Sequence, residues 1–278
     1  MKGGPVPSFL LCPPFCYALL FAMPSFFVVR GRGGRYAGGM DGIEFSGVEY
    51  AVQGKPVLQG ITLSLHERRI GIVGRNGSGK TTLLRLMAGL VAPTSGTIRV
   101  AGVDPAVDRK AMLRAIGILF QNPDHQIIFP TVEEELAFGL RQLGLRAGEA
   151  TARVRACLAA EARAHWASAP VTALSQGQKQ WLCLMAVLLM EPATLLLDEP
   201  FAALDLPTQA RLSRRLAALP QRLITISHDP QAVAECDRVI WLEAGRVVGD
   251  GAAAGVLAAF RAEMARRGDS DADTDLGA

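Results

Sequence analysis

The sequence lacks the excess of basic residues that a nucleic-acid-binding face requires. Its 29 bases and 26 acids give a formal net charge of +3, but the first 39 residues contain four of the bases and none of the acids. The rest of the chain therefore holds 25 bases against 26 acids and is close to electrical balance. Binding of nucleic acid through a basic surface is not supported by this distribution.

Cysteine is too scattered for a disulfide-stabilised secreted domain. The five cysteines are Cys12, Cys16, Cys157, Cys183 and Cys236, and no second Cys or His pair lies near Cys12 and Cys16 to complete a metal site. This usage is typical of a reduced, cytosolic protein. With 278 residues, 50% of them hydrophobic, the chain is long enough for one large α/β domain or two small ones.

Charge is also missing from residues 9–29, which form a strongly apolar run between Lys2 and a group of arginines. A signal sequence or a membrane span is one interpretation of this run. Three prolines interrupt it, however, and that number is unfavourable for a single membrane helix. We expect translation to begin at Met40, which makes residues 1–39 an artefact of the assigned start; a genuine but dispensable extension and a membrane anchor are the alternatives.

The segment Gly74–Thr81 carries the clearest indication of function, because it has the GxxxxGK[ST] pattern of a phosphate-binding loop. An apolar strand pattern precedes it and an apolar helix pattern follows, so its N–H groups and the helix dipole can face phosphate oxygens. Lys80 is expected to reach the β- and γ-phosphates, and Thr81 to complete the shell of a bound Mg²⁺. The predicted phosphate-binding residues are Gly74, Arg75, Asn76, Gly77, Ser78, Gly79, Lys80, Thr81 and Thr82.

Three further strand patterns end in polar residues, at the positions where open α/β sheets bind ligands. The strands and the residues at their ends are 116–120 with Gln121, 194–197 with Asp198 and Glu199, and 223–227 with His228. Asp198 is expected to hold Mg²⁺ through water, while Glu199 is free to orient and polarise an attacking water. Solvated or merely structural side chains are the alternative for each.

The other segments predict the organisation around this site. Residues 43–50 and 61–65 alternate apolar and polar side chains, which indicates an antiparallel patch before the phosphate loop. Residues 132–164 are predicted to be mainly helical, and residues 239–248 form a hairpin that turns at 244–245. Residues 268–278 are polar and rich in aspartate, which predicts a disordered tail.

Ser175 is predicted to cap a long apolar helix that runs to Met190. The positive end of such a helix can bind an anion, although capping alone also explains the serine. Tyr50 lies at the end of the first strand pattern, where its ring could stack on a purine base or simply cover the edge of a sheet.

The ordered set of motifs from Met40 to about Leu257 resembles the ATP-binding subunit of ABC transporters. The similar segments are Gly74–Thr81 (Walker A loop), Gln121 (Q-loop), Leu174–Gln178 (signature), Leu195–Glu199 (Walker B strand), Ala203–Asp205 (D-loop) and His228 (switch histidine). The resemblance implies an α/β fold: a P-loop NTPase (RecA-like) core with a parallel sheet, an antiparallel β subdomain, and a helical subdomain inserted at about residues 122–172. Residues 258–278 would then be the end of a C-terminal helix and an acidic tail.

The same resemblance implies roles for individual residues. Glu199, His228, Gln121 and Lys80 would be the catalytic set for ATP hydrolysis, and Thr81, Gln121 and Asp198 would hold Mg²⁺. Tyr50 would stack on the base of ATP. Two subunits of this family pack head to tail around two ATP molecules, so Ser175 and Gly177 would act on the nucleotide of the partner subunit. Gln176 stands where glycine is usual and Trp181 where arginine is common, and we still expect activity.

Residues 120–126 and 130–139 narrow the resemblance to the ATPases of energy-coupling factor (ECF) importers. Such importers take up vitamins or transition metal ions, and the segments are most similar to biotin-importer ATPases, followed by cobalt or nickel importers. The implied partners are a second ATPase subunit, identical or not, an integral membrane coupling subunit and a substrate-capture subunit. The protein would lie peripherally on the cytoplasmic face of the inner membrane.

Two other classes of protein are less consistent with the sequence. Non-transport ABC ATPases that act on ribosomes or DNA typically carry two ATPase domains or a long coiled-coil insertion, whereas this chain has one phosphate loop and a short helical insertion. A phosphate-loop kinase or GTPase has no use for Leu174–Gln178.

Overall fold

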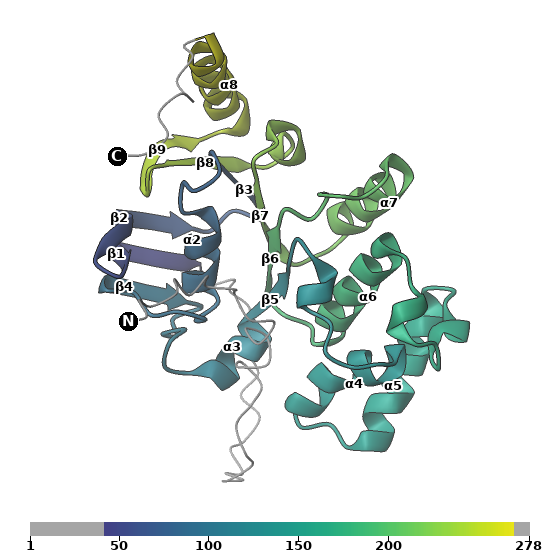
Figure 1. Cartoon of the computed structure of the whole chain (residues 1–278). Coiled ribbons are helices and arrows are strands. Elements are labelled where there is room, and N and C mark those ends of the chain that lie inside the picture. The colour runs from purple at the N-terminus through teal and green to yellow at the C-terminus, as the bar shows by residue number, and fades with distance from the viewer. Residues whose placement is uncertain (1–41, 270–278) are drawn as a thin grey trace, which may run out of the picture.

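The strand that leads into the phosphate loop lies inside a six-stranded sheet. The computed structural model describes residues 42–269. The strands of the larger sheet are β3 (Arg69–Val73), β5 (Ile116–Leu119), β6 (Thr194–Asp198), β7 (Arg222–Ser227), β8 (Arg238–Glu243) and β9 (Arg246–Gly251). Their order is β5-β6-β7-β3-β8-β9, and all neighbours are parallel except β8 and β9 (Figure 1).

The central strands end together at one edge of this sheet. Every residue of β6 and β7 is buried, as expected for parallel strands that are covered on both faces. Val73 pairs with Ser227, and Asp198 pairs with Ile226, so the residues that follow the three strands meet at the same level. The predicted gathering of polar residues at this edge follows from that register.

A separate three-stranded sheet confirms the predicted antiparallel patch. It contains β1 (Ile43–Val52), β2 (Lys55–Leu65) and β4 (Ser95–Val100) in the order β2-β1-β4, beside α2 (Lys80–Met87) (Figure 1). Its buried side chains join those of β3 and α2 in the main core. The helix that begins at the phosphate loop is therefore anchored between two sheets.

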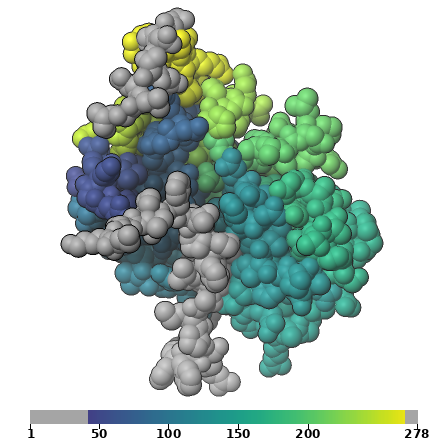
Figure 2. Space-filling view, in the orientation of Figure 1, coloured from purple at the N-terminus to yellow at the C-terminus, as the bar shows by residue number. Residues whose placement is uncertain are grey.

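The helical insertion is also confirmed (Figures 1 and 2). It has a hydrophobic core of its own. Its elements, with the helix that follows it, are the 3₁₀ turn η1 (Pro123–His125), α4 (Val132–Gln142), α5 (Ala147–Ala160), η2 (Ala164–Trp166), η3 (Val171–Ala173) and α6 (Gln176–Leu189). Three glutamates lie in the first turn of α4, where their negative charge interacts favourably with the positive end of the helix dipole. Apolar residues of α6 close this core, so the helix connects the insertion with the sheet beneath.

Three other helices complete the described part of the chain, with the 3₁₀ turn η4 (Pro230–Val233). They are α3 (Arg109–Ala115), α7 (Leu206–Ala217) and α8 (Ala253–Asp269). Asp108 caps α3 and Asp205 caps α7, each by accepting a hydrogen bond from an N–H of the first turn. On α8, Phe260 packs its ring edge against Trp241 of β8, with 5.5 Å between ring centroids.

The C-terminal prediction needs a correction. Helix α8 continues through Asp269, whereas a disordered tail was expected from Gly268, so that boundary is wrong by two residues. The remainder of the predicted tail, residues 270–278, lies outside the described residues, as do residues 1–39 with Cys12 and Cys16. Within 42–269 no helix is long and apolar enough to cross a membrane.

Candidate nucleotide-binding site

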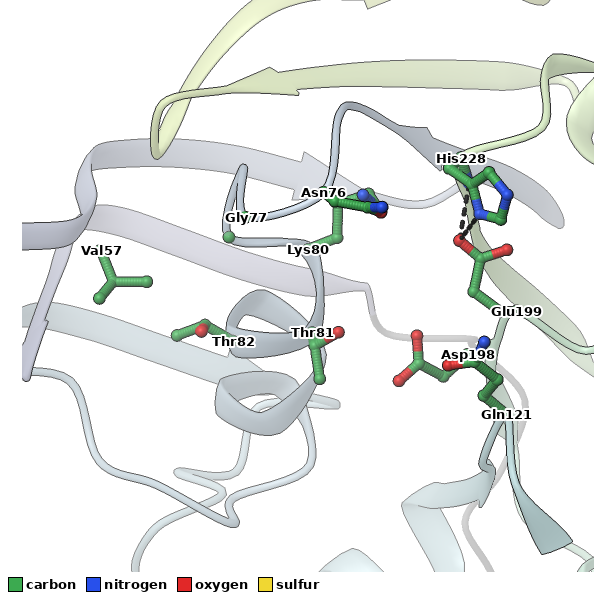
Figure 3. A pocket seen from close by; sticks show the side chains of 11 residues that line it. Val57, Asn76, Gly77, Lys80, Thr81, Thr82, Gln121, Asp198, Glu199 and His228 are labelled. Atoms are coloured by element: carbon green, nitrogen blue, oxygen red, sulfur yellow. Dashed lines mark hydrogen bonds and ion pairs between the residues drawn. The ribbon is translucent and has the colours of Figure 1, made fainter. Parts of the chain in front are cut away.

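A cavity of about 470 Å³ opens where the strands of the larger sheet end. Its lining brings together segments that are far apart in the sequence: Val57, Asn76, Gly77, Gly79, Lys80, Thr81, Thr82, Gln121, Asp198, Glu199 and His228. Figure 3 shows Asp198, Glu199 and Gln121 facing the phosphate loop and the start of α2 across this space. All of these residues except Val57 were predicted from the sequence to belong to the site.

The phosphate loop depends on glycine at two positions for different reasons. Gly77 has φ +77°, and a Cβ there would meet open space, so its need for glycine is conformational. Gly79 has φ +102°, and a Cβ there would lie 2.7 Å from Leu58, so it allows close packing as well. Between them the Ser78 hydroxyl is buried and finds no hydrogen-bond partner within residues 42–269. A phosphate group fits this loop, because it would supply acceptors to exposed backbone N–H groups and to that hydroxyl.

Lys80 is held at the mouth of the loop by carbonyl groups. Its Nζ donates to Gly74 O at 2.7 Å and to Arg75 O at 2.8 Å. Burial lowers the pKa of the lysine, while the carboxylates of Glu199 and Asp198 act in the opposite direction. The ammonium group is therefore positioned beside the cavity with its donors already aligned by the loop backbone.

Asp198 is the buried acid of the site, with 8% of its surface exposed. Burial, and then the charge of Glu199, raise the pKa of its carboxyl to about 6, against the opposing effect of Arg85 and Lys80. In Figure 3 its carboxylate faces Thr81 across the cavity. Carboxylate, hydroxyl and amide oxygens are the ligands that Mg²⁺ prefers, so Asp198, Thr81 and Gln121 fit a bound Mg²⁺.

Glu199 is fixed by donors from the end of β7. Its Oε1 accepts from the backbone N–H of His228 at 2.7 Å and lies 2.7 Å from His228 Nδ1, while Oε2 accepts from Ser227 Oγ at 2.9 Å. Its backbone has φ +46°, an unusual value for a residue with a side chain. These contacts hold the carboxylate at the cavity wall, which is the geometry that a general base or a water-orienting group requires.

Sequence reasoning missed two residues of this site. Ser227 was included only as the last residue of a strand, although a hydroxyl beside His228 at a strand end is a usable indication. Val57 lines the cavity from β2, and nothing in its sequence context indicates that position. Ser227 could be predicted because it is adjacent to a predicted site residue, whereas Val57 lies at the cavity only because the three-stranded sheet packs against α2.

Several predicted residues lie outside this cavity. Tyr50 is half-buried against the main core and does not appear in the lining, so base stacking by its ring remains a prediction. Gly74 and Arg75 line a neighbouring pocket of about 280 Å³ together with His228 and residues of α8. Ser175 and Gly177 line neither space.

Ser175 and Gly177 form the beginning of α6. Ser175 Oγ accepts from the N–H of Gln178 at 3.3 Å, and Gln178 Oε1 accepts from the N–H of Ser175 at 2.8 Å, which is a closed capping box. A Cβ on Gly177 would lie 2.9 Å from the Thr208 side chain of α7. The glycine therefore also has a packing role, because it lets the ends of α6 and α7 approach each other.

Trp181, which departs from the family pattern, belongs to a structural cluster. The Arg163 guanidinium lies 4.9 Å from the Trp181 ring centroid and 5.1 Å from that of Trp166. Trp181 Nε1 donates to Glu161 at 3.3 Å, and Arg215 of α7 donates to the same carboxylate at 2.9 Å. The cluster connects the helical insertion with α7 and contributes nothing to the lining of the cavity.

Comparisons with known proteins agree with the geometry. A family model described as ABC transporter matches residues 58–202. The biotin transport ATP-binding protein of Rhodobacter capsulatus is 51% identical over 225 residues, which cover 81% of this chain and 96% of that relative. The nickel import ATP-binding protein of the same organism is 41% identical over 81% of this chain and 93% of its own.

A solved structure extends the likeness to the arrangement of the elements. The cbiO1 protein of Clostridium perfringens, described as part of the ABC transporter complex cbiONQ, superposes with a TM-score of 0.68 at 30% identity. The match covers 83% of this chain and 95% of that protein. The fold is thus shared with a protein described as part of an ABC transporter complex.

Proposed function

Because the chain belongs to the ABC transporter family, as an ATP-hydrolysing subunit of an importer, we propose that it energises the uptake of biotin through a complex of the ECF type. The observation that carries the enzymatic part is the contact of Glu199 with His228 opposite Lys80 in one cavity. The identity of the substrate rests on the 51% identical biotin transport relative.

In the proposed reaction the chain binds the phosphates of ATP through the loop Gly74–Thr82. Lys80 exchanges the carbonyl oxygens that it now contacts for β- and γ-phosphate oxygens. Thr81, Asp198 and Gln121 would hold Mg²⁺, which would neutralise charge on the phosphates. Tyr50 remains our candidate for stacking on the base.

Glu199 is the proposed general base. Its carboxylate orients a water and accepts its proton as the water oxygen bonds to the γ-phosphorus, while the bond from that phosphorus to the β–γ bridging oxygen breaks and ADP leaves. Ser227 and His228 keep this carboxylate from turning away, and we propose that the exposed ring of His228 contacts the γ-phosphate. These two residues therefore support the reaction by positioning and by hydrogen bonding.

The site is proposed to be completed by a second ATPase subunit. Ser175 and Gly177 lie outside the cavity of their own chain, so we infer that they face the nucleotide of a partner, identical or not. The cbiO1 relative is part of a transporter complex, which supports an integral membrane coupling subunit and a substrate-capture subunit as further partners. The protein would then bind peripherally at the cytoplasmic face of the inner membrane.

Co-purification from membranes tests the proposal. The full chain, tagged at its C-terminus, is expected to bring down a membrane scaffold and a small capture protein, from which biotin can be extracted. Membrane vesicles that contain this complex should accumulate labelled biotin when ATP is supplied, and should not do so with Glu199→Gln. Nickel or cobalt in place of biotin would reassign the substrate, and ribosomal partners without a membrane protein would contradict the importer.

A further inference from the structure

The residue that departs from the family pattern in the signature makes a contact that glycine could not make. Gln176 is the first residue of α6, and its Nε2 donates to Asp124 Oδ2 at 3.0 Å. Asp124 lies in the 3₁₀ turn η1, three residues after Gln121. The contact therefore joins the signature to the segment that supplies a proposed ligand of Mg²⁺, across 52 residues of sequence.

A second donor from the same helix face reaches the same carboxylate. Lys179 Nζ donates to Asp124 Oδ1 at 2.6 Å. Gln176 and Lys179 are three positions apart, so both side chains project from one face of α6. Each oxygen of Asp124 thus has its own donor from α6, and the Lys179 hydrogen bond lowers the pKa of this carboxyl, which keeps it ionised at neutral pH.

The opposite end of the contact is equally well defined. Asn122 Oδ1 accepts from the backbone N–H of Asp124 at 3.0 Å, which fixes the turn immediately after Gln121. The carbonyl of Phe120, on the other side of Gln121, accepts from Gln180 of α6 at 3.2 Å. Gln121 is therefore flanked on both sides by residues that are bonded to α6.

We propose that Gln176, with Asp124 and Lys179, is a positioning residue that couples the Gln121 segment to the start of α6 in the same subunit. Movement of Gln121 toward a bound nucleotide is transmitted to Ser175, one residue before Gln176. The subunit thereby adjusts the hydroxyl that it presents to its partner according to the occupancy of its own cavity. This inference rests on the proposed function, because Ser175 contacts nucleotide only in a two-subunit assembly.

Exchange of donor and acceptor tests the coupling in the purified importer complex. Gln176→Glu places a carboxylate against Asp124, and we expect kcat for ATP hydrolysis to fall about three- to tenfold. The KM for ATP should stay within about twofold, because the cavity residues are untouched. The double variant Gln176→Glu with Asp124→Asn restores a hydrogen bond of reversed polarity, so kcat should return toward that of the wild type.

A matched control makes the same chemical change elsewhere in the helical insertion. Gln142→Glu alters an exposed glutamine at the end of α4 and should leave kcat unchanged. An unaltered kcat in Gln176→Glu, or a loss that the double variant does not recover, overturns the coupling. Failure of the proposed function is a different result: the wild-type complex itself would not hydrolyse ATP, or Ser175→Arg would turn over normally.

Discussion

The helix starts at α2 and α6 are both proposed to act on ATP, but they are built differently. The first residue before α2 is Gly79, which has no side chain to cap the helix, and the neighbouring Ser78 hydroxyl is buried without a hydrogen-bond partner in the described part of the chain. At α6 the box between Ser175 and Gln178 satisfies the N–H groups of these two residues. The start of α2 therefore has no side-chain cap, whereas the start of α6 has a reciprocal one.

This difference predicts that the start of α2 governs the affinity for ATP and that the start of α6 governs ATP turnover. An uncapped end whose backbone N–H groups face a cavity has most to gain from a phosphate, so α2 should determine nucleotide binding. A capped helix start that presents a hydroxyl adds little to the binding of ATP in its ground state. The start of α6 should therefore act mainly when the two subunits close on the reacting γ-phosphate. Substitutions at the two helix starts should therefore separate binding from catalysis.

Ser175→Arg is expected to have the largest effect. A long cationic side chain at the start of α6 blocks close approach of a partner, so ATP turnover should fall by at least about a hundredfold. The Kd for ATP, measured by equilibrium titration, should remain close to that of the wild type, because α2 is untouched. Steady-state phosphate release gives the turnover.

Asp108→Arg is the control for Ser175→Arg. Asp108 is another exposed helix-capping residue, at α3 and away from the cavity, so its loss should leave turnover intact. A marked rise in the Kd for ATP in Ser175→Arg would break the comparison, since it would give α6 a share of ground-state binding. Normal turnover would refute the partner-facing role altogether.

Glu199→Gln should leave the starts of α2 and α6 unchanged but stop the hydrolysis of ATP. The amide can still contact water but is a poor acceptor of its proton, so turnover should fall about a hundredfold or more. With ATP and Mg²⁺ the variant should elute as a dimer on gel filtration, because closure is no longer reversed by hydrolysis. The exposed Glu44→Gln in β1 is the matched control. A Glu199→Gln chain that stays monomeric under these conditions would speak against closure around ATP.

Lys80→Ala tests directly whether the start of α2 determines the affinity for ATP. Loss of charge-assisted hydrogen bonds to phosphate should raise the Kd for ATP about ten- to a hundredfold. Equilibrium binding of a fluorescent ATP analogue measures this, and the exposed Lys110→Ala on α3 serves as the control. An unchanged Kd in Lys80→Ala would mean that α2 does not dominate binding, and the distinction between the two helix starts would be lost.

The sequence predicts the α2 side of the comparison better than the α6 side. The phosphate loop is a local pattern, because one strand, one turn and one helix fix the relative positions of Gly74 and Lys80. The strand ends at Asp198 and His228 are also predictable, since parallel strands must end at a common edge. Those features need no knowledge of which distant segments pack together.

Features that depend on packing between distant segments were not predicted. The contact of Gln176 with Asp124 and the place of Val57 in the cavity both need segments far apart in the sequence to pack together. Tyr50 illustrates the same limit, because its position in β1 was predicted but its contact with the core was not. Trp181 also departs from the family pattern, and only the structure shows it bonded to Glu161.

Asp198→Asn tests how much the buried charge of this residue lowers the stability of the folded chain. Burial raises the pKa of Asp198 to about 6 in the folded chain, above its ordinary value of 3.8. The folded state therefore binds the proton more tightly than the unfolded state, and the ionised carboxylate lowers stability as pH rises from about 4 through 6. Above this range the amide variant should be more stable by about 1–3 kcal/mol.

Thermal unfolding of the nucleotide-free chain between pH 4 and pH 8 measures this difference. The Tm advantage of Asp198→Asn should be near zero at the acid end, grow through pH 6 and then level off at a few degrees. The control is Asp104→Asn, in the loop between β4 and α3. Asp250→Asn is unsuitable, although Asp250 is exposed, because Arg238 binds its carboxylate. An advantage that does not vary with pH would show that burial of the Asp198 charge is not its cause.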